Sequence, residues 1–63
     1  MEKGKYKVNS NREFKDCHLS LKVGDIYEMI DSHKDEKVDI SFHGQSYTVD
    51  QNALTECSKS LKY

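Results

Sequence analysis

The chain has 63 residues, of which 35% are hydrophobic and 33% are charged, with a formal net charge of -1. A chain this short buries only about 60% of the surface that its unfolded form exposes, so we expect one domain over residues 1–63 with a small core. No run of about 18 apolar residues and no apolar segment near the start occur, so we expect neither a membrane-spanning helix nor a secretory signal. The size favours a module that acts through its surface over an enzyme with a deep cleft.

The cysteines indicate a reducing environment. Cys17 and Cys57 are the two cysteines of the chain, and neither lies in a Cys-x-x-Cys motif. Small domains that depend on disulfide bonds usually carry more cysteines than this. We therefore expect two reduced, partly buried thiols and a cytoplasmic protein.

The small net charge conceals an uneven distribution. Residues 1–7 and 55–63 together sum to +3, because five lysines stand against two glutamates, whereas residues 8–54 sum to -4, with five basic and nine acidic side chains. If the two ends of the chain are neighbours in the fold, the basic and acidic residues will form separate surfaces.

The first half of the chain is predicted to form short strands separated by polar turns. Residues 5–8 predict a strand, and the Asn- and Ser-rich residues 9–12 predict a turn. Apolar residues alternate over 19–23, which is typical of a half-buried strand. Gly24-Asp25 predicts a turn before a further strand over residues 26–30.

The second half contains the clearest pattern, a β-hairpin that follows a charged loop over residues 31–37. Apolar residues alternate from Val38 to Phe42 and again at Tyr47 and Val49, on either side of His43-Gly44. A two-residue turn at His43-Gly44 would pair Val38 with Val49, Ile40 with Tyr47 and Phe42 with Gln45. Turn and alternation therefore predict the same register.

The C-terminal segment predicts a short helical turn and a last strand. Asp50 can cap a 3₁₀ turn over residues 51–54, and residues 55–61 read as a weaker strand. Five short strands without a long helix favour an all-β fold, a small five-stranded barrel with one short 3₁₀ turn, because closure removes exposed sheet edges. The expected core comprises Val8, Leu19, Leu21, Val23, Ile26, Ile30, Val38, Ile40, Tyr47, Val49 and Leu54.

The order of these elements resembles an SH3-like barrel. The element Leu19-Ser20-Leu21-Lys22-Val23-Gly24-Asp25 is similar to the diverging turn of that family. The resemblance implies that residues 9–18 are the RT loop, 31–37 the n-Src loop, His43-Gly44 the distal hairpin and 51–54 the 3₁₀ turn. The aromatic peptide-binding residues of the family are missing: Asn9 and Asn11 stand at its tyrosine positions, and Ala53 replaces the groove tyrosine. A polyproline ligand needs such an aromatic groove.

Catalysis and metal binding find little support in the sequence. A Cys-His nucleophile needs an orienting group and a pocket, and Cys17 and His18 would point to opposite faces of a strand. No two cysteines or histidines have the spacing of two to four residues that zinc sites favour. We expect no enzyme activity, no metal, no cofactor and no small-molecule substrate.

Binding to a protein partner is the function that we expect first. The two long loops would place an aromatic anchor beside acidic residues, and interfaces draw affinity from buried aromatics and association rate from complementary charge. The module would act as a regulator or inhibitor that occupies a partner's surface, and such a small chain could come from a virus or a mobile element. The residues expected to bind are Arg12, Glu13, Phe14, Lys15, Asp31, Asp35, Glu36 and Asp39.

Nucleic-acid binding is the alternative. In an SH3-like barrel the first and last strands are neighbours, which would gather the terminal lysines beside Tyr6 and Tyr63 into one basic patch. Lysines beside exposed aromatic rings suit single strands and phosphate backbones. The residues of this alternative site are Lys3, Lys5, Tyr6, Lys7, Lys59 and Lys62.

Overall fold

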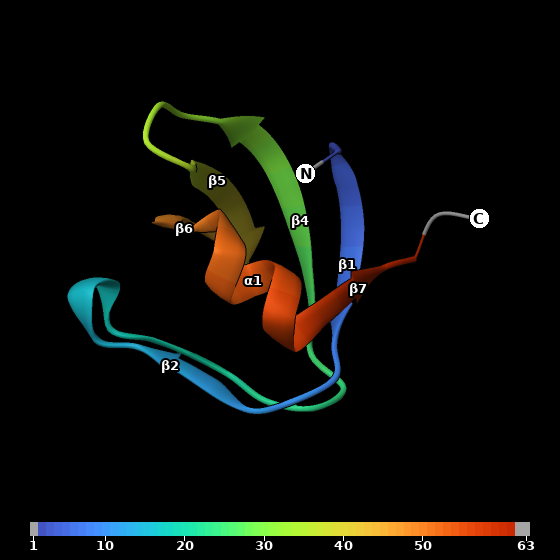
Figure 1. Cartoon of the computed structure of the whole chain (residues 1–63). Helices are drawn as coiled ribbons and strands as arrows, with labels where there is room; N and C mark the ends of the chain where they lie inside the picture. Colours follow the sequence, from blue (N-terminus) through green and yellow to red (C-terminus); the bar gives the residue numbers. More distant parts are fainter. Residues whose placement is uncertain (1, 62–63) are drawn as a thin grey trace.

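The computed structural model describes residues 2–61, which form an antiparallel sheet, a two-stranded ribbon and one α-helix (Figure 1). Within these residues the larger sheet has the strand order β6-β5-β4-β1-β7, and β2 pairs with β3 in the ribbon. A 3₁₀ turn, η1, joins β2 to β3, and α1 joins β6 to β7. In chain order the elements are β1 (Gly4–Val8), β2 (Arg12–Phe14), η1 (Lys15–Cys17), β3 (Leu19–Leu21), β4 (Ile26–Ser32), β5 (Lys37–Phe42), β6 (Gln45–Asp50), α1 (Gln51–Cys57) and β7 (Ser58–Ser60).

The β5–β6 hairpin has the register predicted from the sequence. Val38 lies opposite Val49, and Ile40 lies opposite Tyr47. His43 and Gly44 form the two-residue turn, and both have positive φ angles, 51° and 78°. Positive φ at both central positions is typical of the tight turns whose twist matches that of the flanking strands. The agreement arises because turn and alternation both specify the same pairing.

The prediction for β4 was wrong about which face is buried. Tyr27 and Met29 are buried, whereas Ile26 and Ile30 are exposed. Antiparallel pairing with β1 places Tyr6 opposite Tyr27, and the two rings stack with their centroids 5.5 Å apart. The register shifts between Met29 and Asp31, where β4 pairs with β5. Since opposed residues share a face, the pairing of β4 with β1 puts its aromatic residue in the core and its isoleucines outside.

Val23 also lies outside the core, contrary to expectation. The strand ends at Leu21, and residues 22–25 form a turn in which the Asp25 carboxylate accepts a hydrogen bond from the Lys22 backbone amide at 2.9 Å. The turn holds Val23 in solvent. Among the remaining residues of the expected core, Tyr47 is partly buried and packs against the core. The others are confirmed as buried: Val8, Leu19, Leu21, Val38, Ile40, Val49 and Leu54.

The predicted 3₁₀ turn over 51–54 is a seven-residue α-helix, α1. Asp50 is its N-cap, as expected, and its side chain accepts a hydrogen bond from the Asn52 amide at 3.0 Å. Ala53, Leu54 and Cys57 are buried, a spacing that places them on one helical face. Burial of Cys57 favours the longer helix and shortens the last strand to Ser58–Ser60.

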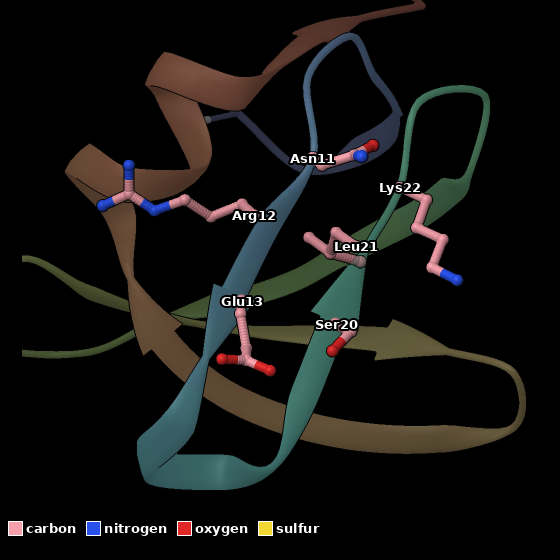
Figure 2. Close-up of a pocket in the computed structure, with 6 residues that line it drawn as sticks. All are labelled: Asn11, Arg12, Glu13, Ser20, Leu21 and Lys22. Atoms are coloured by element: carbon pink, nitrogen blue, oxygen red, sulfur yellow. The ribbon is translucent and has the colours of Figure 1, made fainter.

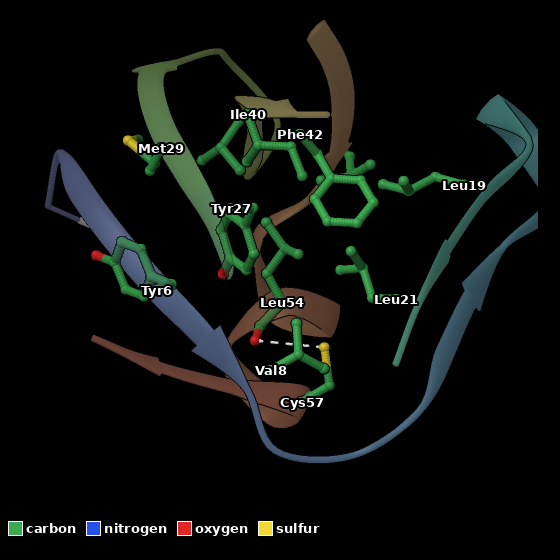
Figure 3. Close-up of a cluster of buried hydrophobic side chains, with 12 residues drawn as sticks. Tyr6, Val8, Leu19, Leu21, Tyr27, Met29, Ile40, Phe42, Leu54 and Cys57 are labelled. Atoms are coloured by element: carbon green, nitrogen blue, oxygen red, sulfur yellow. Dashed lines mark hydrogen bonds between the residues drawn. The ribbon is translucent and has the colours of Figure 1, made fainter. Parts of the chain in front are cut away.

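Within residues 2–61 neither sheet closes into a barrel. β6 and β7 are the two edges of the larger sheet, and α1 runs between them and packs against both (Figure 1). The helix thus occupies the gap that direct pairing of the edges would close. The core lies between the inner face of the sheet, the β2–β3 ribbon and α1, with Leu21 and Leu54 directed toward Tyr27 and Phe42 (Figure 3).

Candidate functional site

The β2–η1–β3 arm carries four of the predicted partner-binding residues. Phe14 lies opposite Leu19 and packs partly buried against the core, so it is not a free aromatic anchor. Glu13 lies opposite Ser20 on the outward face of the ribbon (Figure 2). The Arg12 side chain extends toward α1, where its guanidinium lies 3.5 Å from the Glu56 carboxylate (Figure 2). Lys15 is exposed at the start of η1.

A cleft of about 140 Å³ lies where η1 approaches the end of β6. Its wall on the arm side contains Phe14, Asp16 and Cys17. The opposite wall comes from the start of β5 and the end of β6, and its residues are Lys37, Thr48, Val49 and Asp50. The cleft therefore combines partly buried apolar groups with charged groups. Of these residues, only Phe14 had been predicted to bind, because alternation and turn signals do not show that η1 folds back onto β6.

The loop between β4 and β5 is hydrogen-bonded to the start of α1. The Glu36 carboxylate accepts a hydrogen bond from the Asn52 side-chain amide at 3.0 Å, and the Glu36 carbonyl accepts one from the Gln51 backbone amide at 2.8 Å. Asp35 and Glu36 both have positive φ angles, 62° and 60°. Since Lys37 follows directly, this loop is anchored beside the cleft.

Asp31 and Asp39 lie elsewhere, opposite one another on the outer face of the sheet. The Asp39 carboxylate accepts a hydrogen bond from the Thr48 hydroxyl at 2.5 Å, and its other oxygen lies 2.6 Å from His33 Nε2. Both hydrogen bonds lower the pKa of Asp39, and the bond from Thr48 contributes more than the bond with His33. The predicted acidic patch is thus divided: Asp35 and Glu36 lie in the loop beside the cleft, and Asp31 and Asp39 on the sheet.

The residues of the alternative site are placed only in part as predicted. β1 and β7 are neighbours, and Lys7 lies directly opposite Lys59. Lys3 and Lys5 are exposed at the start of the chain. Tyr6, however, is buried and stacked on Tyr27, so its ring is not available to a nucleotide base. Lys62 and Tyr63 lie outside the described residues.

The described part of the chain contains potential metal ligands and two thiols, but they are not gathered at one place. Among residues 2–61 no group of three or more His, Cys, Asp and Glu side chains is placed to hold a metal ion. No helix there is long and apolar enough to cross a membrane. Cys17 and Cys57 are free thiols, the first partly buried and the second fully buried.

Comparison with known proteins gives no family assignment. No protein-family model matches the chain, and no curated protein or solved structure matches it either.

Proposed function

We propose that this chain is an SH3-like, non-enzymatic module that binds a protein partner and acts as a regulator or inhibitor by occupying the partner's surface. The order of the elements supports the resemblance: β2 and η1 precede the segment compared with the diverging turn, a charged loop precedes a two-residue hairpin, and β1 lies between β4 and β7. The free thiols support a reducing, cytoplasmic setting.

The cleft between η1 and the ends of β5 and β6 carries the proposal. Its apolar lining can receive a side chain of the partner, while Asp16 at the rim is exposed and can attract a basic residue. The β4–β5 loop is hydrogen-bonded to α1, which holds one wall of the cleft in place before the partner binds. Such preorganisation reduces the entropy lost on binding.

Affinity capture from the native host, with nuclease treatment, tests this function. We expect wild-type protein to retain a protein prey after nuclease treatment, and Asp16→Asn to weaken its capture. Glu28→Gln is the matched control, since Glu28 is an exposed carboxylate on the outer face of β4, opposite Lys5. Equal capture by both variants and wild type would place binding outside the cleft.

Nucleic-acid binding remains the second candidate because Lys7 and Lys59 lie opposite one another with Lys5 on the same strand as Lys7. It predicts that nuclease removes all captured material and that oligonucleotide affinity falls steeply with salt. Recovery of nucleic acid alone in a parallel capture without nuclease would favour it over protein binding.

A further inference from the structure

A second surface, separate from the cleft, gathers most of the large exposed apolar side chains of the described residues. Val23 is 64% exposed, Ile26 50% and Leu61 40%. Val23 and Leu61 line a common hollow of about 340 Å³ at the end of β1, together with Lys7, Val8, Asn9, Lys59 and Ser60. Ile26 lies opposite Lys7 on the neighbouring strand. We call the five side chains of Lys7, Val23, Ile26, Lys59 and Leu61 the β1–β7 patch.

The backbone beneath this patch is fixed by hydrogen bonds. The turn that carries Val23 is joined to β1 through Gly24 N to Val8 O at 2.9 Å and Val8 N to Asp25 O at 2.8 Å. The Asn11 side chain accepts a bond from the Val23 amide at 3.0 Å. Because these bonds hold Val23 in solvent in one position, little conformational freedom remains to be lost when a partner covers it.

The backbone of Leu61, which also lines the hollow, is held by a hydrogen bond as well. Leu61 follows β7, the edge strand, and its amide donates to the Lys5 carbonyl at 3.0 Å. Leu61 is therefore paired with β1 while its side chain stays partly exposed. Val23 and Leu61 therefore both line one hollow whose backbone is already hydrogen-bonded.

The charge around the hollow is positive. Lys7 and Lys59 are directly opposite across β1 and β7, and like charges in that position destabilise a sheet. Lys22 adds a further cation in the turn beside Val23, and the nearby Asp25 carboxylate bonds to the Lys22 amide within that turn. A ligand with carboxylates would relieve the repulsion between Lys7 and Lys59, and its apolar groups would cover Val23 and Leu61.

We infer that the β1–β7 patch is a docking site for an acidic, amphipathic segment of a partner protein. Its apolar residues are aliphatic, and Tyr6 on the same strand is buried, so the described part of the patch has no exposed aromatic ring on which a base could stack. Aliphatic contacts flanked by lysines suit a segment in which apolar and acidic residues alternate. The inference concerns a different surface from the cleft and can fail independently of it.

A binding titration with a synthetic peptide tests the inference. The probe is a short peptide in which leucines alternate with pairs of glutamates, followed by NMR of the full chain. We expect saturable binding with chemical-shift changes at the backbone amides of Lys7, Val23, Lys59 and Leu61. Replacing the peptide's glutamates by glutamines, or its leucines by serines, should weaken binding about tenfold.

Variants separate binding from folding. Lys7→Gln with Lys59→Gln should weaken binding about tenfold without loss of stability, because it removes a like-charge pair. Val23→Ser should weaken it by a similar factor, since Val23 is exposed before binding. The matched controls, Lys15→Gln with Lys34→Gln and Ile30→Ser, alter exposed residues outside the hollow and should bind as wild type.

Three outcomes would overturn the inference. One is that the acidic peptide does not bind, or that it shifts residues of the cleft instead of the patch. Another is that the control variants lose as much affinity as the patch variants. The third is that single-stranded oligothymidine or phosphatidylserine vesicles bind the patch while the peptide does not, which would assign the lysines to a polyanion or an anionic lipid surface.

Discussion

The Tyr27 hydroxyl on β4 lies 2.6 Å from the Ser58 hydroxyl at the start of β7, although the strand β1 separates the two in the sheet. Ser58 Oγ donates to the Leu54 carbonyl of α1 at 2.5 Å, so the Tyr27 hydroxyl is the donor to Ser58. Both residues are buried. This chain of two hydrogen bonds connects the sheet, the helix and the last strand in the interior of the molecule.

Because Tyr27 donates to Ser58 and Ser58 donates to Leu54, substitutions of Tyr27 and Ser58 should have unequal effects on stability. Tyr27→Phe removes one donor and leaves Ser58 bonded to Leu54, so it should cost about 1 kcal/mol of unfolding free energy. Ser58→Ala leaves the Tyr27 hydroxyl without its partner and should cost about 2 kcal/mol. Urea unfolding measures both, with exposed Ser46→Ala as the control. Equal losses for the two variants would contradict the assigned direction of the bonds.

Burial of Tyr27 also predicts loss of stability in alkali. Desolvation raises the pKa of Tyr27 from 10.0 to about 12, while its bond to Ser58 opposes the shift. A group whose pKa is raised by folding stabilises the fold below its unfolded pKa, and this contribution is lost as the pH rises through the folded value. Unfolding free energy should therefore fall between pH 10 and about 12. The fall should be smaller in Tyr27→Phe; an identical pH profile would refute the role of this phenol.

The hydrophobic pattern was sufficient for β5 and β6 and insufficient for β4. Alternation over Val38–Phe42 has one apolar face, whereas residues 26–30 are apolar at Ile26, Tyr27, Met29 and Ile30 and fit either face. Only pairing with β1, which brings Tyr6 onto Tyr27, selects between them. Short-range patterns carry no information on such long-range pairing when both faces are apolar.

The candidate site was less predictable than the fold. The sequence predicted loops over residues 9–18 and 31–37, but it did not show that η1 packs against β6 to form a cleft. It also treated Val23 and Ile26 as core because they are apolar, although tertiary hydrogen bonds and strand register hold them in solvent. Exposed apolar residues of this kind are visible only once the pairing is known.

Acid should weaken the contact between β5 and β6 at Asp39. The Thr48 and His33 bonds lower the pKa of Asp39 below its ordinary value of 3.8. A carboxylate whose pKa is lowered by folding stabilises the fold above its unfolded pKa, and this contribution is lost as the pH falls through the folded value. Asp39→Asn should therefore be less stable than wild type at neutral pH, and the difference should vanish well below pH 3.8.

An NMR titration of the Asp39 carboxyl carbon separates the two causes. Thr48→Val removes the larger contribution and should move the pKa of Asp39 back toward its ordinary value, more than His33→Gln does. A larger change in the His33 variant would show that the imidazole, and not the hydroxyl, determines the shift.

The hairpin turn predicts a conformational penalty at Gly44. Its φ angle is 78°, which residues with a Cβ adopt at a cost, and a Cβ there would meet no atom within 4 Å. Gly44→Ala should therefore lower the unfolding free energy by about 1 kcal/mol through backbone strain alone. Urea unfolding measures the loss. Unchanged stability would mean that the turn adopts another conformation.

The two thiols should differ sharply in reactivity. Cys57 is buried on α1, its Sγ lies 3.7 Å from the Leu54 carbonyl, and desolvation raises its pKa. Cys17 is only partly buried, at the cleft between η1 and β6. Since the thiolate is the reactive form, a thiol reagent should modify Cys17 in the folded protein and reach Cys57 only on unfolding. Native-state labelling followed by peptide mass spectrometry measures this, with Cys17→Ser as the control that should abolish native labelling. Rapid modification of Cys57 in that variant would show that α1 opens without global unfolding.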